Sequence, residues 1–196
     1  MKKITKTLLC LSSVCLLAGC AKEVTADEAK AAVKKANEKT PDISAVYTGV
    51  KLTTKVETLQ GTGTVGTAMK QQYTKMHGVE GTEKTIELKF NTSLAYEISS
   101  YRLNEAVIDE MLSELEDADE GSNSYVKFYL DGDALSIKSS IAASMSVGGS
   151  SLTIYSEIEY KTNADMTLAK GSTHIYFNCE TDSLDYKVSM STEWMK

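Results

Sequence analysis

The sequence is poor in residues that build covalent or metal cross-links, with four cysteines and two histidines among 196 residues. No Cys/His spacing in it matches a zinc site, so we expect no structural metal and no cofactor. Basic residues are also few, at 21 Lys plus Arg against 27 Asp plus Glu. Nucleic acid is disfavoured as a partner, because its affinity depends on clustered Lys and Arg that neutralise phosphates.

Long apolar runs are lacking as well. The apolar stretch at residues 7–19 follows a basic start that contains Lys2, Lys3 and Lys6. It is too short to cross a membrane, which takes about 20 apolar residues. Its length fits the apolar central part of a secretory signal peptide, which has about 7 to 15 residues. Residues 1–19 are therefore predicted to be a signal peptide that is removed on export.

The segment Leu17-Ala18-Gly19-Cys20 resembles the lipobox of bacterial lipoproteins, in which a lipid transferase and a dedicated peptidase recognise a branched apolar residue, two small residues and a cysteine. The resemblance implies that Cys20 becomes the N-terminus and carries a diacylglyceryl group on sulfur. Two acyl chains hold a protein firmly, since each buried CH₂ contributes about 0.8 kcal/mol. We expect a cell-membrane location on the extracytoplasmic face, with residues 20–25 as lipidated N-terminus and tether.

Removal of residues 1–19 would change both the charge and the thiol content. Lys plus Arg would fall from 21 to 18 against 27 acidic residues, which gives a net charge of −9. With Cys10 and Cys15 removed and Cys20 acylated, Cys179 would be the only thiol, so no intrachain disulfide is expected. Residues 26–196 suit a single domain stabilised by burial and hydrogen bonds.

Helices and strands in the first half follow from caps and from the period of the apolar residues. A capping box at residues 25–28 and the only proline, Pro41, predict a helix over 26–39. A weak strand is expected near 63–76, in a stretch rich in Thr and Gly. Two further strands are predicted by alternation, the first through Val46, Val50, Leu52 and Val56, the second through Ile86, Leu88, Phe90, Leu94, Tyr96 and Ile98.

The second half repeats this pattern. Asn104 can cap a helix whose apolar stripe runs from Val107 to Leu115. After an acidic loop, alternation predicts a series of strands in hairpin order, with turns at 131–133, 148–149 and 170–171. The segments concerned are 125–130, 135–147, 152–160, 164–169, 173–180 and 184–194.

Short connections between long, one-sided strands predict an α+β fold: a curved antiparallel sheet, meander-like and half-barrel in form, with an N-terminal helix and one inserted helix. This element order resembles the half-barrel lipoproteins and lipoprotein carriers of the LolA and LppX type. The resemblance covers most of the mature chain but includes no motif residue. It implies a concave face that holds acyl chains, and hence an apolar ligand.

No catalytic group is expected from the reactive side chains. Cys179 and His174 lie five residues apart on one predicted strand, so they point to opposite faces, and Cys179 is interpreted as a small buried residue. His77 is expected to be exposed in a turn. An acidic group after the second helix has the wrong order for an EF-hand and is interpreted as a solvated helix end. Its members are Glu114, Glu116, Asp117, Asp119 and Glu120.

Methionine and tyrosine on the predicted sheet faces leave two interpretations open, an adaptable cavity lining or an ordinary core. The residues concerned are Met69, Tyr73, Tyr96, Met145, Tyr160, Met166, Tyr186 and Met190. We therefore expect a non-enzymatic lipoprotein, in contact with the membrane through its lipidated N-terminus, that holds an apolar small molecule. The alternative is an interaction module for an unknown envelope protein, through a sheet edge or the acidic helix end.

Overall fold

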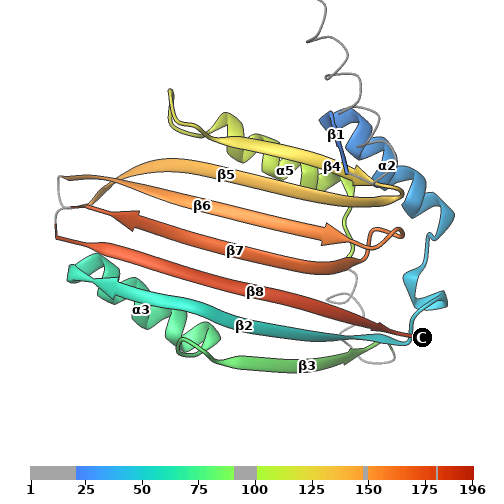
Figure 1. Ribbon diagram of the computed structural model, residues 1–196, viewed down its shortest axis with the longest axis horizontal. Helices are drawn as coiled ribbons and strands as arrows, with labels where there is room; N and C mark the ends of the chain where they lie inside the picture. The colour runs from blue at the N-terminus through green and yellow to red at the C-terminus, as the bar shows by residue number, and fades with distance from the viewer. Residues whose placement is uncertain (1–20, 91–100, 148–149, 180) are drawn as a thin grey trace, which may run out of the picture.

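An eight-stranded antiparallel sheet, open and curved, runs through the computed structural model, which describes residues 21–90, 101–147, 150–179 and 181–196 (Figure 1). The strand order is β1-β4-β5-β6-β7-β8-β2-β3. The α+β, half-barrel-like class is thus confirmed. In chain order the elements are β1 (Lys22–Val24), α2 (Ala26–Lys39), η1 (Ile43–Ala45), β2 (Gly49–Thr62), α3 (Gly63–His77), β3 (Glu83–Lys89), α5 (Glu105–Glu116), β4 (Tyr125–Asp131), β5 (Ala134–Val147), β6 (Ser150–Thr162), β7 (Leu168–Asn178) and β8 (Ser183–Met195).

The centre of the sheet is a meander of five consecutive strands, β4 to β8, to which the N-terminal strands add at both edges. β2 pairs with β8 and carries β3 at its outer side, whereas β1 pairs with β4 at the opposite edge. Between them, α2 and η1 carry the chain past the strand ends (Figure 1). Residues 22–24, expected to be part of a tether, are therefore part of the sheet.

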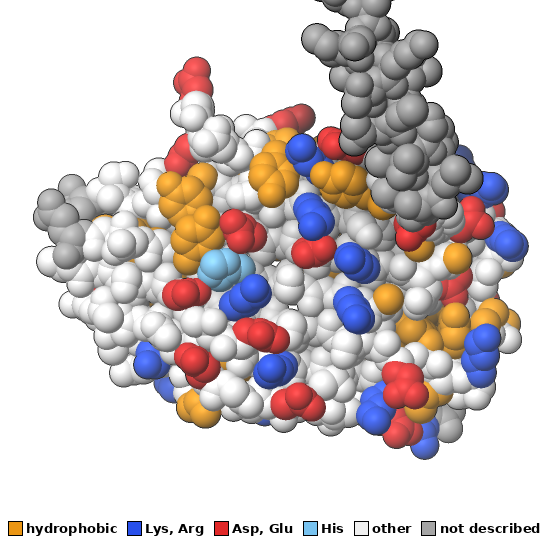
Figure 2. All heavy atoms as spheres, in the orientation of Figure 1, with side chains coloured by type: hydrophobic (Ala, Val, Ile, Leu, Met, Phe, Trp, Pro, Cys, Tyr) orange, Lys and Arg blue, Asp and Glu red, His pale blue; other side chains and the backbone are white. Residues whose placement is uncertain are grey.

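The described helices pack on one face of the sheet, called here the inner face. α2 and α5 cover a cluster around Ile108, Phe128 and Ile137, and α3 covers a second cluster around Phe177 and Tyr186. The opposite, outer face carries interspersed basic and acidic side chains (Figure 2). Burial on one side only explains the alternation that predicted these strands.

Both helices predicted from the sequence, α2 and α5, are confirmed together with their capping residues. At the start of α2, the Glu28 N–H donates to Thr25 Oγ1 at 3.2 Å and the Thr25 N–H donates to Glu28 Oε2 at 2.8 Å. Asn104 Oδ1 accepts from the Val107 N–H at 3.2 Å at the start of α5. These bonds satisfy amide donors that have no partner within the helix.

The strand predicted near 63–76 is wrong, because this segment forms the helix α3 and is a second inserted helix. Its Thr and Gly residues have low helix propensity, which tertiary packing overrides. Val65, Met69 and Tyr73 follow one another every four residues and pack together on the second cluster. This spacing indicates a helix, but the Thr- and Gly-rich composition of the segment had favoured a weak strand.

Three strand boundaries also differ from prediction. β7 is continuous over Leu168–Asn178, so the turn expected at 170–171 lies instead between Thr162 and Leu168. β3 ends at Lys89, and the part of its alternation beyond Phe90 lies outside the described residues. Val46, assigned to a strand, precedes β2 and is 44% exposed.

Candidate functional site

A groove lies between α5 and the inner face of the sheet, with a volume of about 320 Å³. This size is at the lower end of small-molecule pockets, which occupy about 300–1,000 Å³. We call it the α5 groove. Its lining consists of Tyr101, Arg102, Leu103, Val107, Glu110, Tyr160, Thr162, Leu168 and Met190.

The floor of the α5 groove comes from one row of side chains across four strands. Ile137 lies opposite Tyr160, Tyr160 opposite Gly171, and Gly171 opposite Met190. A Cβ atom at position 171 would lie 3.1 Å from the Tyr160 ring. Because glycine has no side chain, the Tyr160 ring can lie over position 171, and Met190 follows on the next strand of the row.

One wall is formed by the segment that leads into α5. The Leu168 N–H donates to the Tyr101 carbonyl at 2.7 Å, and the Leu103 N–H donates to the Met166 carbonyl at 2.9 Å. Trp194 Nε1 donates to the Leu168 carbonyl at 2.8 Å. The backbone on this side is thus hydrogen-bonded, so the wall has a defined position.

Polar groups in the α5 groove are few, and they are acidic on the helix side. Glu110 lines the groove, and Glu114 follows one helical turn later. Burial raises the pKa of Tyr160, and the carboxylates of Glu114 and Glu110 raise it further. The Tyr160 hydroxyl has no hydrogen-bond partner among the described residues. The groove can therefore offer a ligand the apolar side chains of Leu103, Val107, Leu168 and Met190, the phenol of Tyr160 and the carboxylate of Glu110, with Glu114 one helical turn further along α5.

Arg102 lines the groove but directs its nitrogens at backbone carbonyls. Nη1 donates to the Thr40 carbonyl at 2.6 Å, Nη2 to the Ala36 carbonyl at 3.2 Å and Nε to the Asp165 carbonyl at 3.0 Å. The first two carbonyls lie at the C-terminal end of α2, where the Ala36 carbonyl also accepts from the Thr40 N–H at 3.1 Å. Arg102 thus joins α2 to the β6–β7 turn. We call this arrangement the Arg102 clamp.

Asp165 extends the Arg102 clamp to the segment before β2. Its Oδ2 accepts from the Tyr47 hydroxyl at 2.6 Å, and its Oδ1 accepts from Thr167 Oγ1 at 2.6 Å and the Thr167 N–H at 3.1 Å. Although burial raises the pKa of Asp165, these bonds outweigh burial and hold it below its usual value. Burial, together with the bond to Asp165, raises the pKa of Tyr47 to about 12.

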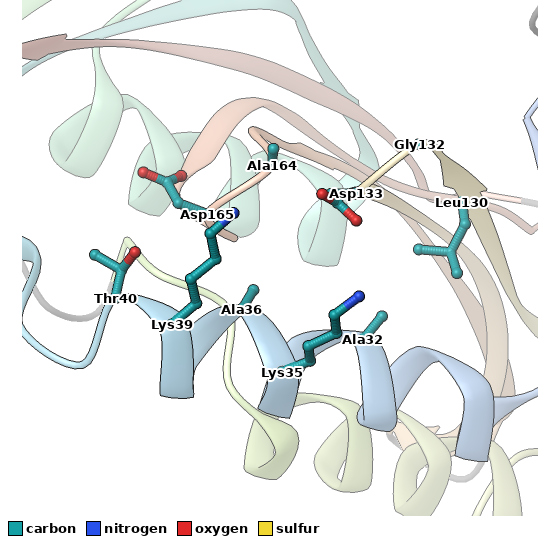
Figure 3. Close-up of a pocket in the computed structure, with 10 residues that line it drawn as sticks. All are labelled: Ala32, Lys35, Ala36, Lys39, Thr40, Leu130, Gly132, Asp133, Ala164 and Asp165. Carbon is teal, nitrogen blue, oxygen red and sulfur yellow. The ribbon is translucent and has the colours of Figure 1, made fainter.

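A second hollow, of about 350 Å³, lies between α2 and two turns of the sheet. Figure 3 shows Lys35 and Lys39 extending from α2 toward the turns that carry Asp133 and Asp165. Its charged groups are of both signs, and Asp165 already accepts hydrogen bonds from Tyr47 and Thr167. This hollow has no preference for a ligand of one charge.

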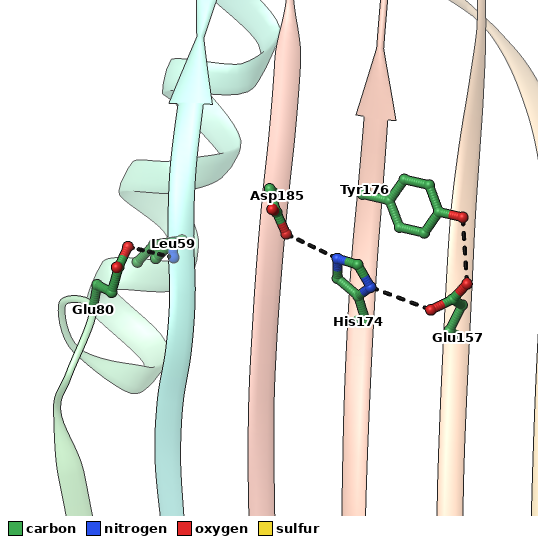
Figure 4. Close-up of polar contacts among 6 residues, drawn as sticks. All are labelled: Leu59, Glu80, Glu157, His174, Tyr176 and Asp185. Atoms are coloured by element: carbon green, nitrogen blue, oxygen red, sulfur yellow. Dashed lines mark hydrogen bonds and ion pairs between the residues drawn. The ribbon is translucent and has the colours of Figure 1, made fainter.

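The outer face carries a polar cluster around His174. Its Nε2 lies 2.8 Å from Asp185 Oδ1 and its Nδ1 lies 3.2 Å from Glu157 Oε2 (Figure 4). The Tyr176 hydroxyl donates to Glu157 Oε1 at 3.3 Å. Both ring nitrogens of His174 thus face carboxylates, which holds the imidazole between two strands and leaves it no nitrogen for another group.

The predicted lipidation residue, Cys20, lies outside the described residues.

Two other residues considered in the sequence, Cys179 and His77, do not lie where they were expected. Cys179 was expected to be buried, which is wrong: it is exposed, and its Sγ lies 3.3 Å from the Asp182 carbonyl. β7 ends at Asn178, so the parity argument does not extend to Cys179. His77 ends α3 and is half-buried, with its ring centroid 5.8 Å from that of Tyr186, and is not in an exposed turn.

One member of the acidic group at the end of α5, Asp119, has a structural role. Asp119 accepts at Oδ1 from the Ser144 N–H at 3.0 Å and at Oδ2 from Ser144 Oγ at 2.6 Å. The Asp119 N–H donates to the Ala142 carbonyl at 3.0 Å. Asp119 therefore binds the edge of β5 at Ala142 and Ser144, beyond the point where the first residue of β4, Tyr125, pairs with β5. Within the described ranges, no group of His, Cys, Asp or Glu side chains is placed to hold a metal ion.

The methionine and tyrosine set divides between the two interpretations. Met166 and Tyr186 are buried in the core, and Tyr73 stacks on Tyr186 with ring centroids 4.1 Å apart. Tyr160 and Met190 line the α5 groove. Met145 is 48% exposed, Met69 packs on the second cluster, and Tyr96 is not among the residues that the structure describes.

No family model, curated protein or solved structure matches the chain. In the described part of the chain, no helix has both the length and the apolar character needed to cross a membrane.

Proposed function

We propose that the protein is a membrane-anchored extracytoplasmic lipoprotein that holds a lipid or another apolar molecule in the α5 groove. The α5 groove itself carries this proposal, because it combines a volume of about 320 Å³ with the apolar side chains of Leu103, Val107, Leu168 and Met190. Pockets that are mostly apolar and contain a few polar groups bind small molecules. The Tyr160 hydroxyl, which lacks a partner among the described residues, is such a group.

Filling the α5 groove should weaken ligand binding without unfolding the protein. In Met190→Trp the larger indole would occupy the floor beside Gly171, and we expect binding of dodecanol to weaken at least tenfold. Native mass spectrometry of the purified protein would report bound lipid, and displacement of an apolar fluorescent probe would report affinity. The matched control is Met145→Trp, whose side chain is 48% exposed. Wild-type protein that carries no lipid from several hosts and binds no dodecanol would contradict the proposal.

The anchor is proposed from the resemblance of Leu17-Ala18-Gly19-Cys20 to a lipobox. Because β1 begins at Lys22 and pairs with β4, an acylated Cys20 would hold this sheet edge and the start of α2 close to the bilayer. An extended chain covers at most about 3.6 Å per residue.

Loss of the thiol at position 20 should prevent both acylation and removal of the signal peptide. We expect Cys20→Ser to keep its signal peptide and to incorporate no radiolabelled palmitate, whereas Cys179→Ser should mature and incorporate label like the wild type. A Cys20→Ser protein that is processed normally and stays with membranes after a high-salt wash would contradict the anchor.

A second candidate function is protein binding through the open edge of the sheet. β3 pairs with β2 on one side only in the described part of the chain, and its Ile86 is 48% exposed. Exposed edges of this kind can accept another strand. Native mass spectra that show a bound protein and no lipid would favour this function over ligand binding.

A further inference from the structure

The charges around the α5 groove distinguish between classes of apolar ligand. α5 contains five acidic residues and no basic residue. Asp109 forms an ion pair with Lys30 of α2, whereas Glu110 and Glu114 have no ion-pair partner within the described ranges. Residues four apart on a helix share a face, so both carboxylates lie on the groove side of α5, with Val107.

Two observations place both carboxylates at the groove. Glu110 is part of the lining, and Glu114 lies one helical turn further along the same face of α5. The charges of both carboxylates also raise the pKa of Tyr160, which lines the groove. Arg102 also lines the groove and keeps its positive charge, but its nitrogens are directed at the carbonyls of Ala36, Thr40 and Asp165. The charges that shift the pKa of Tyr160 are those of Glu114 and Glu110. An anionic head group here would meet two like charges.

We propose that the α5 groove binds a single-chain amphiphile with a cationic head group, an alkylammonium, in preference to a fatty acid or another anionic lipid. The alkyl chain lies on Leu168, Met190 and Val107, and the ammonium lies between the carboxylates of Glu110 and Glu114. Tyr101 and Tyr160 add aromatic rings, which attract quaternary ammonium groups. This inference rests on the proposed function and names the ligand class for the same groove.

The test compares three probes with the same chain and different head groups: dodecyltrimethylammonium, dodecanol and dodecanoate. Residues 21–196, which contain all the described residues, are used so that neither an acyl group nor the apolar signal peptide competes. The probes are titrated below micelle formation against an apolar fluorescent probe. Each partly exposed carboxylate can strengthen binding of a cation by up to about fivefold. We therefore expect the ammonium to bind roughly tenfold more tightly than the alcohol, and dodecanoate to bind most weakly.

Two double variants test whether the carboxylates at the groove cause the preference for the ammonium probe. Glu110→Gln combined with Glu114→Gln should remove the ammonium preference and leave dodecanol binding unchanged. Glu105→Gln combined with Glu116→Gln changes the net charge equally on the opposite face of α5, and should keep the preference.

Each outcome of this comparison has a separate meaning. Equal affinities for the three probes, tighter binding of dodecanoate, or a preference that survives Glu110→Gln/Glu114→Gln would overturn the cationic assignment while the groove stands. Binding of none of them would overturn the proposed function as well.

Discussion

Gly66→Ala should destabilise the protein by about 3 kcal/mol, although alanine is the better helix former by about 1 kcal/mol. Gly66 lies in α3, and a Cβ atom there would lie 1.9 Å from the carbonyl oxygen of Ser183, the first residue of β8. The obstacle is backbone, which cannot rotate away as a side chain can. The helix would have to move off the sheet, and its contacts with the second cluster would loosen.

The neighbouring contacts show why α3 cannot simply shift sideways. On the β2 side, a Cβ at Gly61 would lie 2.3 Å from the Gly66 carbonyl oxygen, so the two backbones are in contact there as well. Asp182, in the β7–β8 turn, accepts from the Val65 N–H at 2.6 Å. This bond and other backbone donors lower the pKa of Asp182. The start of α3 is therefore fixed between β2 and β8.

Urea unfolding and thermal melting would measure the effect of Gly66→Ala. We expect the Tm to fall by roughly 6–12 °C, since each kcal/mol corresponds to about 2–4 °C in a chain of this size. Thr67→Ala is the matched control, because Thr67 is the next residue of α3 and is exposed. It should leave stability within about 0.5 kcal/mol of the wild type. If both variants unfolded at the same urea concentration, the close packing of α3 on β8 would be refuted.

Local signals predicted those elements whose ends are determined by neighbouring residues. The capping box at Thr25 and Glu28 and the stop at Pro41 give α2 its observed bounds, Ala26–Lys39. The hairpin turn at residues 131–133 is likewise in place between β4 and β5, with Gly132 at a φ of 61°. Such signals act within a few residues and need no knowledge of the fold.

Elements that depend on distant contacts could not be predicted in the same way. Gly171 indicated a turn, but it lies inside β7, where the Tyr160 ring of the neighbouring strand lies over it. α3 forms from residues of low helix propensity because Val65, Met69 and Tyr73 pack onto strands that come later in the chain. In both cases tertiary packing overrides the local preference.

The α5 groove was beyond sequence reasoning for the same reason. Tyr160 and Met190 were both named as candidate lining residues, but their proximity depends on a register that joins β6, β7 and β8. Glu110 and Leu103 were not singled out. The helical spacing of Glu110 and Glu114 on the same side as Val107 was a usable signal, because it places two carboxylates beside an apolar stripe.

Arg102→Met should cost about 2–4 kcal/mol of stability, because it removes three hydrogen bonds from a charged group at once. Arg102 is the only arginine of the chain, and it was missed in the sequence although arginine is suited to binding several carbonyls from one planar group. In the variant, the Thr40 carbonyl loses its 2.6 Å hydrogen bond, and the β6–β7 turn loses its link to α2 through the Asp165 carbonyl. Methionine is apolar and of similar length, so the loss reports the hydrogen bonds more than packing.

The comparison that isolates the clamp uses two further variants and two readouts. Lys34→Met removes the same charge from an exposed site on α2 and should change stability by less than about 0.5 kcal/mol. Arg102→Lys keeps the charge but has one nitrogen in place of three, so we expect it to recover less than half of the loss. Hydrogen exchange should become faster at the C-terminal turn of α2, where the Thr40 N–H donates to the Ala36 carbonyl at 3.1 Å. Unfolding of Arg102→Met at the same urea concentration as Lys34→Met would show that the Arg102 clamp does not stabilise α2. The helix would then be held by its other contacts, among them those of the fully buried Ala29 and Val33.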